Sequence, residues 1–172
     1  MFLYKLKNFW IKKNVKKSLS NLRHSVSNNS IKTIGIVIDE SLFDKKEDLI
    51  RELEKSNITR SEIKIIVFRE VIKKNESLSY SAFSYKDLNW NATFNNNAVN
   101  EFINTNFDLL ISYYDVERGP LLQLTCLSKA DFKVGFESVD GRLNQFMIAT
   151  SAIDYKIFIQ ELIKYLKILN KL

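Results

Sequence analysis

The fold of this chain is decided by the stretch Phe107-Asp-Leu-Leu-Ile-Ser-Tyr-Tyr-Asp115. It is an apolar run of strand length that ends in a carboxylate, and Gly119-Pro120 then begin an apolar segment of helical length. Central strands of open parallel sheets have this composition, because helices cover both faces of such a sheet. The pattern predicts a central strand whose carboxyl end places polar side chains at the edge where such sheets bind ligands.

A second apolar run lies earlier in the chain and begins the predicted sheet. It reads Lys32-Thr-Ile-Gly-Ile-Val-Ile-Asp39, is rich in β-branched residues and also ends in a carboxylate. A predicted helix follows, with Ser41 as its N-cap, Asp44 at the capping-box position and Asn57 at its end. Residues 63–69 have the composition of a second strand, so these segments predict a βαβ unit.

The rest of the chain continues to alternate between strand and helix patterns. Short strand patterns cover residues 80–85, 132–136 and 145–149. Helical patterns cover residues 98–104 after the capping run Asn95-Asn-Asn97, residues 119–129, and a closing segment capped by Asp154. We therefore predict an α/β fold in which residues 32–172 form a single domain. Its sheet is open, doubly wound and mostly parallel, with five to six strands in a Rossmann-like or flavodoxin-like arrangement.

Composition excludes several classes of site. The chain has 172 residues, of which 45% are hydrophobic and 27% charged, so it is long enough to bury a sizeable core. Because Cys126 is the only cysteine and His24 the only histidine, we expect no internal disulfide and no zinc site of cysteines and histidines. A Ser-His-Asp triad would require His24, which precedes the sheet. No glycine-rich loop follows the first strand, which argues against a dinucleotide-binding fold or a P-loop enzyme. We expect no metal and no cofactor.

The N-terminal segment is strongly basic. Eight basic residues and no acidic residue precede Asp39, whereas the rest of the chain is close to neutral. Residues 1–24 are predicted to form a basic amphipathic helix, joined to the domain by a polar linker at residues 25–31. Such a helix suits an anionic partner, either the inner face of a membrane or RNA such as the ribosome. The predicted contact residues are Lys5, Lys7, Phe9, Trp10, Lys12, Lys13, Lys16 and Lys17.

Two apolar stripes lie on nearly opposite sides of this predicted helix. The earlier stripe is formed by Phe2, Leu3, Leu6, Phe9 and Trp10, and the later one by Ile11, Val15, Leu19 and Leu22 with Tyr4. We expect the later stripe to pack on the protein's own domain and the aromatic one to meet a partner or to bend back. Two alternatives remain open: both stripes belong to the core, or the earlier stripe joins two copies of the chain.

Polar residues follow the predicted strands and form a candidate ligand crevice. The candidate catalytic residues are Asp39, Glu40, Asp115 and Glu137, which have the chemistry of general acids and bases or of oxygen ligands for a cation. The candidate crevice residues are Tyr113, Tyr114, Arg118 and Arg142. A polar loop at residues 86–94 carries Trp90, and we interpret it either as a functional loop or as a surface insertion.

Several stretches together resemble an uncharacterised bacterial family of about this length. They are Ile36-Val-Ile-Asp-Glu-Ser41, Phe83-Ser-Tyr-Lys-Asp-Leu88, the central strand, Phe132-Lys-Val-Gly-Phe136 and the terminal segment at residues 165–172. Residues 107–142 are also similar, more weakly, to the acceptor-side domain of heptosyltransferase-type glycosyltransferases of the GT-B fold. Because the sequence contains no second domain to hold the nucleotide sugar, this second resemblance implies at most a degenerate enzyme.

Two functions are consistent with these observations. The first is a non-catalytic interaction protein whose basic helix docks the α/β domain on an anionic surface. The alternative is a small-molecule binder, or a degenerate glycosyltransferase-like enzyme, that uses the crevice at the strand ends. The sequence contains no pattern of a secretory signal or a membrane span, so we expect a cytoplasmic protein or one peripheral to the inner membrane.

Overall fold

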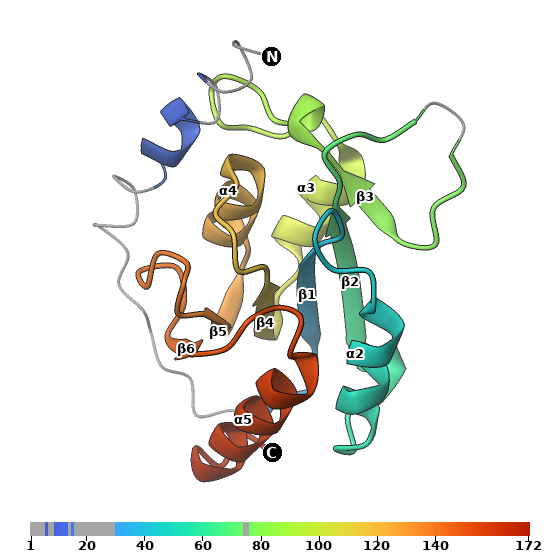
Figure 1. The fold of residues 1–172 in the computed structure, drawn as a ribbon, viewed down its shortest axis with the longest axis vertical. Helices are drawn as coiled ribbons and strands as arrows, with labels where there is room; N and C mark the ends of the chain where they lie inside the picture. Colours follow the sequence, from blue (N-terminus) through green and yellow to red (C-terminus); the bar gives the residue numbers. More distant parts are fainter. Residues whose placement is uncertain (1–5, 7–8, 14, 16–29, 74–75) are drawn as a thin grey trace.

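A six-stranded, all-parallel sheet forms the centre of the protein (Figure 1). The computed structural model describes residues 6, 9–13, 15, 30–73 and 76–172. The strands are β1 (Ile34–Asp39), β2 (Ile63–Phe68), β3 (Ser81–Phe83), β4 (Phe107–Tyr113), β5 (Ala130–Phe136) and β6 (Phe146–Ile148). Their order is β3-β2-β1-β4-β5-β6, and every neighbouring pair is parallel. This order is Rossmann-like and confirms the predicted α/β class.

The two central strands are buried because helices cover both faces of the sheet. All six residues of β1 are buried, as are all residues of β4 except Asp108. Parallel pairing places Ile34 beside Leu109 on one side and beside Ile63 on the other. Gly35 is required at its position, since a Cβ there would lie 2.9 Å from the ring of Phe107.

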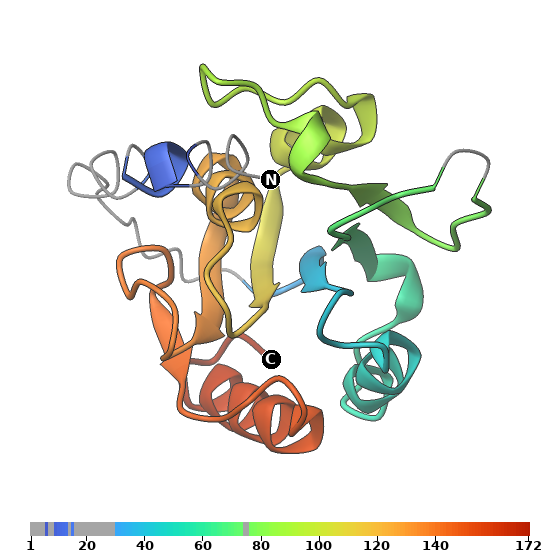
Figure 2. The same cartoon turned by 45° about the horizontal axis from the view of Figure 1, so that its top comes forward.

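Three α-helices and two 3₁₀ turns lie between the strands, and a further helix follows the last strand. The helices are α2 (Lys46–Glu54), α3 (Asn97–Asn104), α4 (Gly119–Leu127) and α5 (Tyr155–Ile168), and the turns are η1 (Arg60–Glu62) and η2 (Tyr85–Asp87). Helices α2 and α5 share one hydrophobic cluster with one face of the sheet, and α3 and α4 share a second cluster with the other (Figures 1 and 2). Successive strand residues supply the two clusters alternately: Ile36 and Ile38 face α2 and α5, whereas Val37 faces α3 and α4.

Residues 9–13 and 15 are helical and lie against the α3–α4 layer. Ile11 and Val15 are buried in the same cluster as Leu121 of α4 and Leu143 of the β5–β6 connection. This packing agrees with the expectation that the later stripe contacts the protein's own domain. The other members of that stripe, and residues 25–29 of the predicted linker, lie outside the described residues. Within the part of the chain that the structure describes, no helix has the length and apolar character needed to cross a bilayer.

The sequence predicted the start of α3 and the end of α2, but the predicted side-chain cap of α5 does not form. Asn96 caps α3 by accepting a hydrogen bond from the backbone N–H of Val99 at 3.2 Å, as predicted. Asn57 has a left-handed φ of 65° just after α2, which is consistent with its predicted role as the stop. Asp154 precedes α5 at the N-cap, but its carboxylate accepts a bond from the Ser151 hydroxyl instead of from the helix.

The predicted start of α2 is wrong. The helix begins at Lys46 rather than after Ser41, and Asp44 takes part in no capping box. The cause lies in Asp39, whose side chain accepts a bond from the Ser41 N–H at 3.0 Å and whose carbonyl accepts one from the Phe43 N–H, so the chain turns before the helix starts. The Ser41 hydroxyl is then used elsewhere, because it accepts a bond from the Glu70 N–H.

Candidate functional site

An ion pair crosses the sheet at the point where the strand order reverses. Asp39 ends β1, and Arg118 precedes α4 after the neighbouring strand β4. The Arg118 Nε donates to Asp39 Oδ2 at 2.6 Å, and its Nη1 lies 2.7 Å from Glu70 Oε1. The guanidinium also lies over the Phe68 ring, 5.6 Å from its centroid, and donates to the Tyr85 hydroxyl at 3.4 Å. Ligands of open parallel sheets usually bind at this point, so the Arg118 side chain occupies the expected crevice.

This ion pair is removed from water. The side chain of Asp39 is 2% exposed and that of Arg118 is 14% exposed. Burial raises the pKa of the Asp39 carboxyl, although the charge and hydrogen bond of Arg118 act in the opposite direction. Burial alone would lower the pKa of Arg118, but its bond to Tyr85 and the charge of Asp39 outweigh burial and raise it. The guanidinium therefore stays charged and holds the carboxylate beside it.

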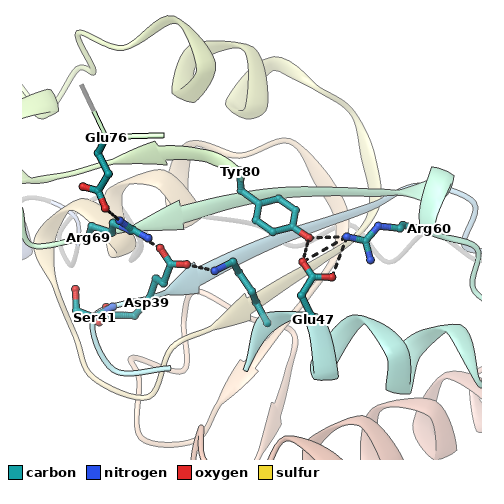
Figure 3. A network of polar contacts seen from close by, with 9 residues as sticks. Asp39, Ser41, Glu47, Arg60, Arg69, Glu76 and Tyr80 are labelled. Atoms are coloured by element: carbon teal, nitrogen blue, oxygen red, sulfur yellow. Dashed lines mark hydrogen bonds and ion pairs between the residues drawn. The ribbon is translucent and has the colours of Figure 1, made fainter. Parts of the chain in front are cut away.

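A second network extends from β1 to the loop after β2 (Figure 3). The Glu40 carboxylate accepts from both Lys46 and Arg69, and Arg69 also bonds Glu76. Burial raises the pKa of Glu40, but the hydrogen bonds from Arg69 and Lys46 outweigh it and lower the pKa overall. Beside this network, Arg60 of η1 donates to the Tyr80 hydroxyl at 2.6 Å, and both side chains contact the carboxylate of Glu47 in α2.

A shallow depression of about 450 Å³ lies beside these networks. Its lining residues are Glu40, Ser41, Arg69, Glu70 and Val71. The carboxylates in this lining already contact cations: Glu40 binds Lys46 and Arg69, and Glu70 binds Arg118. The Glu40 carboxylate is therefore a weak base, because its cationic partners lower its pKa and engage its lone pairs. Among the described residues, no cluster of three or more histidine, cysteine, aspartate or glutamate side chains is arranged to hold a metal ion.

The predicted site residues do not converge on one reaction centre. Asp39 and Glu40 lie in adjacent ion-pair networks. Asp115 instead accepts a hydrogen bond from the Ala152 N–H at 2.9 Å, in the segment that leads to α5. Glu137 is exposed after β5, and Arg142 pairs with its neighbour Asp140 at 2.6 Å. Except for the exposed Glu137, these side chains form contacts that connect loops of the fold.

The two tyrosines at the end of β4 are part of the core. Tyr113 and Tyr114 are almost fully buried, which corrects the prediction that they line a crevice. The Tyr113 hydroxyl donates to the Ala152 carbonyl at 2.7 Å, and that of Tyr114 lies 2.7 Å from Thr125 Oγ1. Burial raises the pKa of both phenols, so both stay protonated.

Sequence reasoning missed Lys46, Glu76 and Tyr85, which complete the networks around Glu40 and Arg118. A weak signal exists for Lys46, because it lies only six residues after Glu40 and close to the strand end. No pattern in the sequence connects Arg118 with Tyr85, which is 33 positions away. Contacts over such distances depend on the strand order.

A buried lysine and a half-buried cysteine face the α4 layer. The Lys133 ammonium on β5 donates to the Thr125 carbonyl at 2.7 Å, and burial lowers its pKa to about 8. Burial raises the pKa of the Cys126 thiol, which keeps it protonated. The role of Cys126 as a small apolar side chain therefore agrees with its surroundings.

The exposed side of the N-terminal helix carries large apolar residues. Leu6, Phe9 and Trp10 are 42%, 65% and 59% exposed, and their spacing of three and four positions places them on one helix face. Lys13 is exposed one turn further on. Lys12 lies beside Glu117, with its ammonium 3.8 Å from the carboxylate. The remaining predicted contact residues, Phe2, Leu3, Lys5, Lys7, Lys16 and Lys17, lie outside the described residues.

A family model matches residues 7–169, and its description is "Family of unknown function (DUF6913)". The chain belongs to this family. The DUF6913 match includes the helical residues 9–13 and 15 as well as all six strands, so the N-terminal helix is part of what the family model covers. No curated protein matches the chain. The similarity of residues 107–142 to GT-B glycosyltransferases receives no support from these comparisons.

Proposed function

We propose that this protein is a non-catalytic interaction protein whose N-terminal helix docks the α/β domain on an anionic membrane surface. The observation that carries this proposal is the exposure of Leu6, Phe9 and Trp10 on a helix that already buries Ile11 and Val15. A surface helix of a globular protein normally directs polar side chains outward. An aromatic outward face is therefore consistent with a contact that the described part of the chain does not provide.

The charge of the segment supports an anionic partner. All eight charged residues before Asp39 are basic, and those of the helix flank its apolar positions. Helices with tryptophan, phenylalanine and leucine on one face and lysines beside them lie in the plane of the membrane interface, where the lysine stems reach toward the headgroups. An apolar face of this kind also favours a membrane over RNA, because a phosphate backbone offers little apolar surface.

The energy available is sufficient for reversible docking. Transferring the exposed parts of Leu6, Phe9 and Trp10 from water contributes roughly 3 kcal/mol, since each is about half exposed. Each lysine close to an anionic leaflet adds about 1 kcal/mol at physiological ionic strength. Apolar insertion and lysine attraction therefore contribute together, and high salt should release the protein.

The strand-end networks argue against the enzymatic alternative. Asp39 and Glu40, the two candidate acids at the end of β1, are engaged by arginine or lysine, and Arg118 occupies the crevice between β1 and β4. These contacts stabilise the loops that surround the sheet. The engagement of Asp39 and Glu40 in ion pairs does not suit either carboxylate to proton transfer.

Co-sedimentation with lipid vesicles tests the proposal. The protein should pellet with vesicles of phosphatidylcholine and phosphatidylglycerol at low salt, but not with pure phosphatidylcholine and not at high salt. The double variant Phe9→Ser, Trp10→Ser should bind at least tenfold more weakly, because it removes most of the exposed apolar face. Both side chains are exposed, so this variant should fold normally.

The matched control is Ile153→Ser, Ile168→Ser, which removes two side chains that are 74% and 63% exposed near the two ends of α5. This control should bind as the unchanged protein does. Equal binding by both double variants would refute the proposal. Salt-sensitive pelleting with ribosomes and not with vesicles would instead identify RNA as the partner.

A further inference from the structure

We propose that Trp90 is a second membrane anchor, so that the protein docks at two points and adopts a fixed orientation on the surface. This inference rests on the proposed function, because it assigns a further contact to the same docking event. Trp90 is 60% exposed in the loop between η2 and α3. The Trp90 loop is defined here as residues 88–96.

The Trp90 loop is a structured turn. Its two ends pair through an antiparallel bridge between Leu88 and Phe94, whose side chains are buried. Inside this bridge the Asn89 N–H donates to the Thr93 carbonyl at 2.8 Å, and the Ala92 N–H donates to the Asn89 carbonyl at 3.1 Å. The backbone of the tip is therefore fixed before any partner binds, and little conformational entropy remains to be lost on binding.

The tip contains a residue in an unfavourable backbone conformation. Ala92 has a φ of 64°, in the left-handed region that non-glycine residues rarely adopt. Its carbonyl accepts a hydrogen bond from Nε2 of Gln123 in α4 at 2.8 Å, which helps to hold this conformation. Trp90 is 60% exposed in this turn, although burial of more of the indole would favour the folded state. The strained backbone of Ala92 and the exposed side chain of Trp90 together point to a contact made by the tip of the loop.

The Trp90 loop and the N-terminal helix both rest on α4. The loop is bonded to Gln123, while Ile11 and Val15 pack in the cluster that contains Leu121 of the same helix. Helix α4 has nine residues and is therefore only about 13 Å long. In both overall views the loop and the helical residues lie at the same end of the molecule (Figures 1 and 2). One flat surface is consequently within reach of both.

The chemistry of the tip suits the headgroup region of an anionic membrane. No residue from Leu88 to Asn96 is charged, so the loop presents no carboxylate that an anionic surface would repel. Lys86 precedes the loop and is exposed. Tryptophan concentrates at membrane interfaces because its ring is apolar while its indole N–H needs a polar partner. Neighbouring asparagine and threonine side chains supply hydrogen-bonding groups at the same depth.

The two tryptophans of the chain provide a direct test, since they are Trp10 and Trp90. In the variant Trp90→Phe the fluorescence reports on the helix, and in Trp10→Phe it reports on the loop. Each full-length variant is titrated with phosphatidylcholine–phosphatidylglycerol vesicles, with and without lipids brominated on their acyl chains. Both variants should show a blue shift of the emission and quenching by the brominated lipids, and high salt should abolish both.

The outcomes separate this inference from the proposed function. A blue shift and quenching for Trp10 but not for Trp90 would overturn the two-anchor inference and leave helix docking intact. The absence of both signals would overturn the inference and the proposed function together. As an independent measure, Trp90→Ser should weaken vesicle binding about tenfold. Ile153→Ser, on the α5 side of the sheet, should leave binding unchanged.

Discussion

Replacing Arg118 by methionine should destabilise the protein more than any loss of an exposed ion pair. The substitution leaves the Asp39 carboxylate, whose side chain is 2% exposed, without its cation. Removing one partner of a buried pair costs about 3–5 kcal/mol, because the remaining charge has lost its solvation and its counter-ion. Urea unfolding at neutral pH, followed by circular dichroism, measures this loss as a lower midpoint.

The pH dependence identifies the cause of that loss. Without Arg118, burial should raise the folded-state pKa of Asp39 further above its value in the unfolded chain. The folded variant then binds a proton more readily than the unfolded chain, so its deficit should shrink as the pH falls and grow as the pH rises. The double variant Arg118→Met, Asp39→Asn should recover a large part of the stability at neutral pH, because no buried charge remains.

The control is Arg51→Met, which removes an arginine that lies 2.9 Å from Asp48 but is 67% exposed. This variant should lose no more than about 0.5 kcal/mol. Equal shifts of the urea midpoint for Arg118→Met and Arg51→Met would refute the conclusion that burial makes the Asp39–Arg118 ion pair contribute more to stability than an exposed pair.

Three further predictions concern other sites. Glu40→Gln should lower the free energy of unfolding by about 2 kcal/mol at neutral pH. Because two basic partners lower the pKa of Glu40 below its usual value, this contribution is lost on acidification. The stabilities of the variant and of the unchanged protein should therefore converge at acidic pH. Burial lowers the pKa of Lys133 in the folded protein to about 8, so the protein should gain stability as the pH rises from about 8 toward the pKa of lysine in the unfolded chain. Lys133→Met should abolish that gain in alkaline denaturation. An unchanged pH profile would contradict the assignment. Gly35→Ala should lower stability by about 1–3 kcal/mol, since its Cβ would lie 2.9 Å from the Phe107 ring, and adding Phe107→Leu should restore part of the loss in thermal melts.

Local patterns were sufficient to predict the strands and most helices. The central strand at residues 107–113 and the first strand at residues 34–39 are continuous apolar runs, and burial on both faces of a parallel sheet requires such runs. The closing helix was predicted from apolar residues at helical spacing, and five of its residues are buried. These features depend on residues that are close in sequence, so their periodicity is visible before folding.

Two of the wrong predictions concern side chains that contact residues far away in the sequence. Ser41 is of a residue type that often caps helices, but its hydroxyl accepts a hydrogen bond from the backbone N–H of Glu70, which follows β2. Tyr114 follows the central strand, where residues that line a crevice are expected, but its hydroxyl lies beside Thr125 in the core. The local sequence is compatible with a cap or a distant bond for Ser41, and with a crevice or a core position for Tyr114. The packing of neighbouring elements determines which of these forms.

Composition and short periodicities are sufficient to establish the alternation of strands and helices and the basic character of the N-terminal segment. They also show that the chain lacks the residues for a glycine-rich phosphate loop or a cysteine–histidine zinc site. The contact of Arg118 with Asp39 across 79 positions, and the exposure of Phe9 and Trp10 beside the buried Ile11, depend instead on how the elements pack. The physical reason is that parallel strands require crossover connections, so the strand order determines which distant side chains become neighbours at the carboxyl edge. The layer of helices around the sheet likewise determines which face of the N-terminal helix is covered.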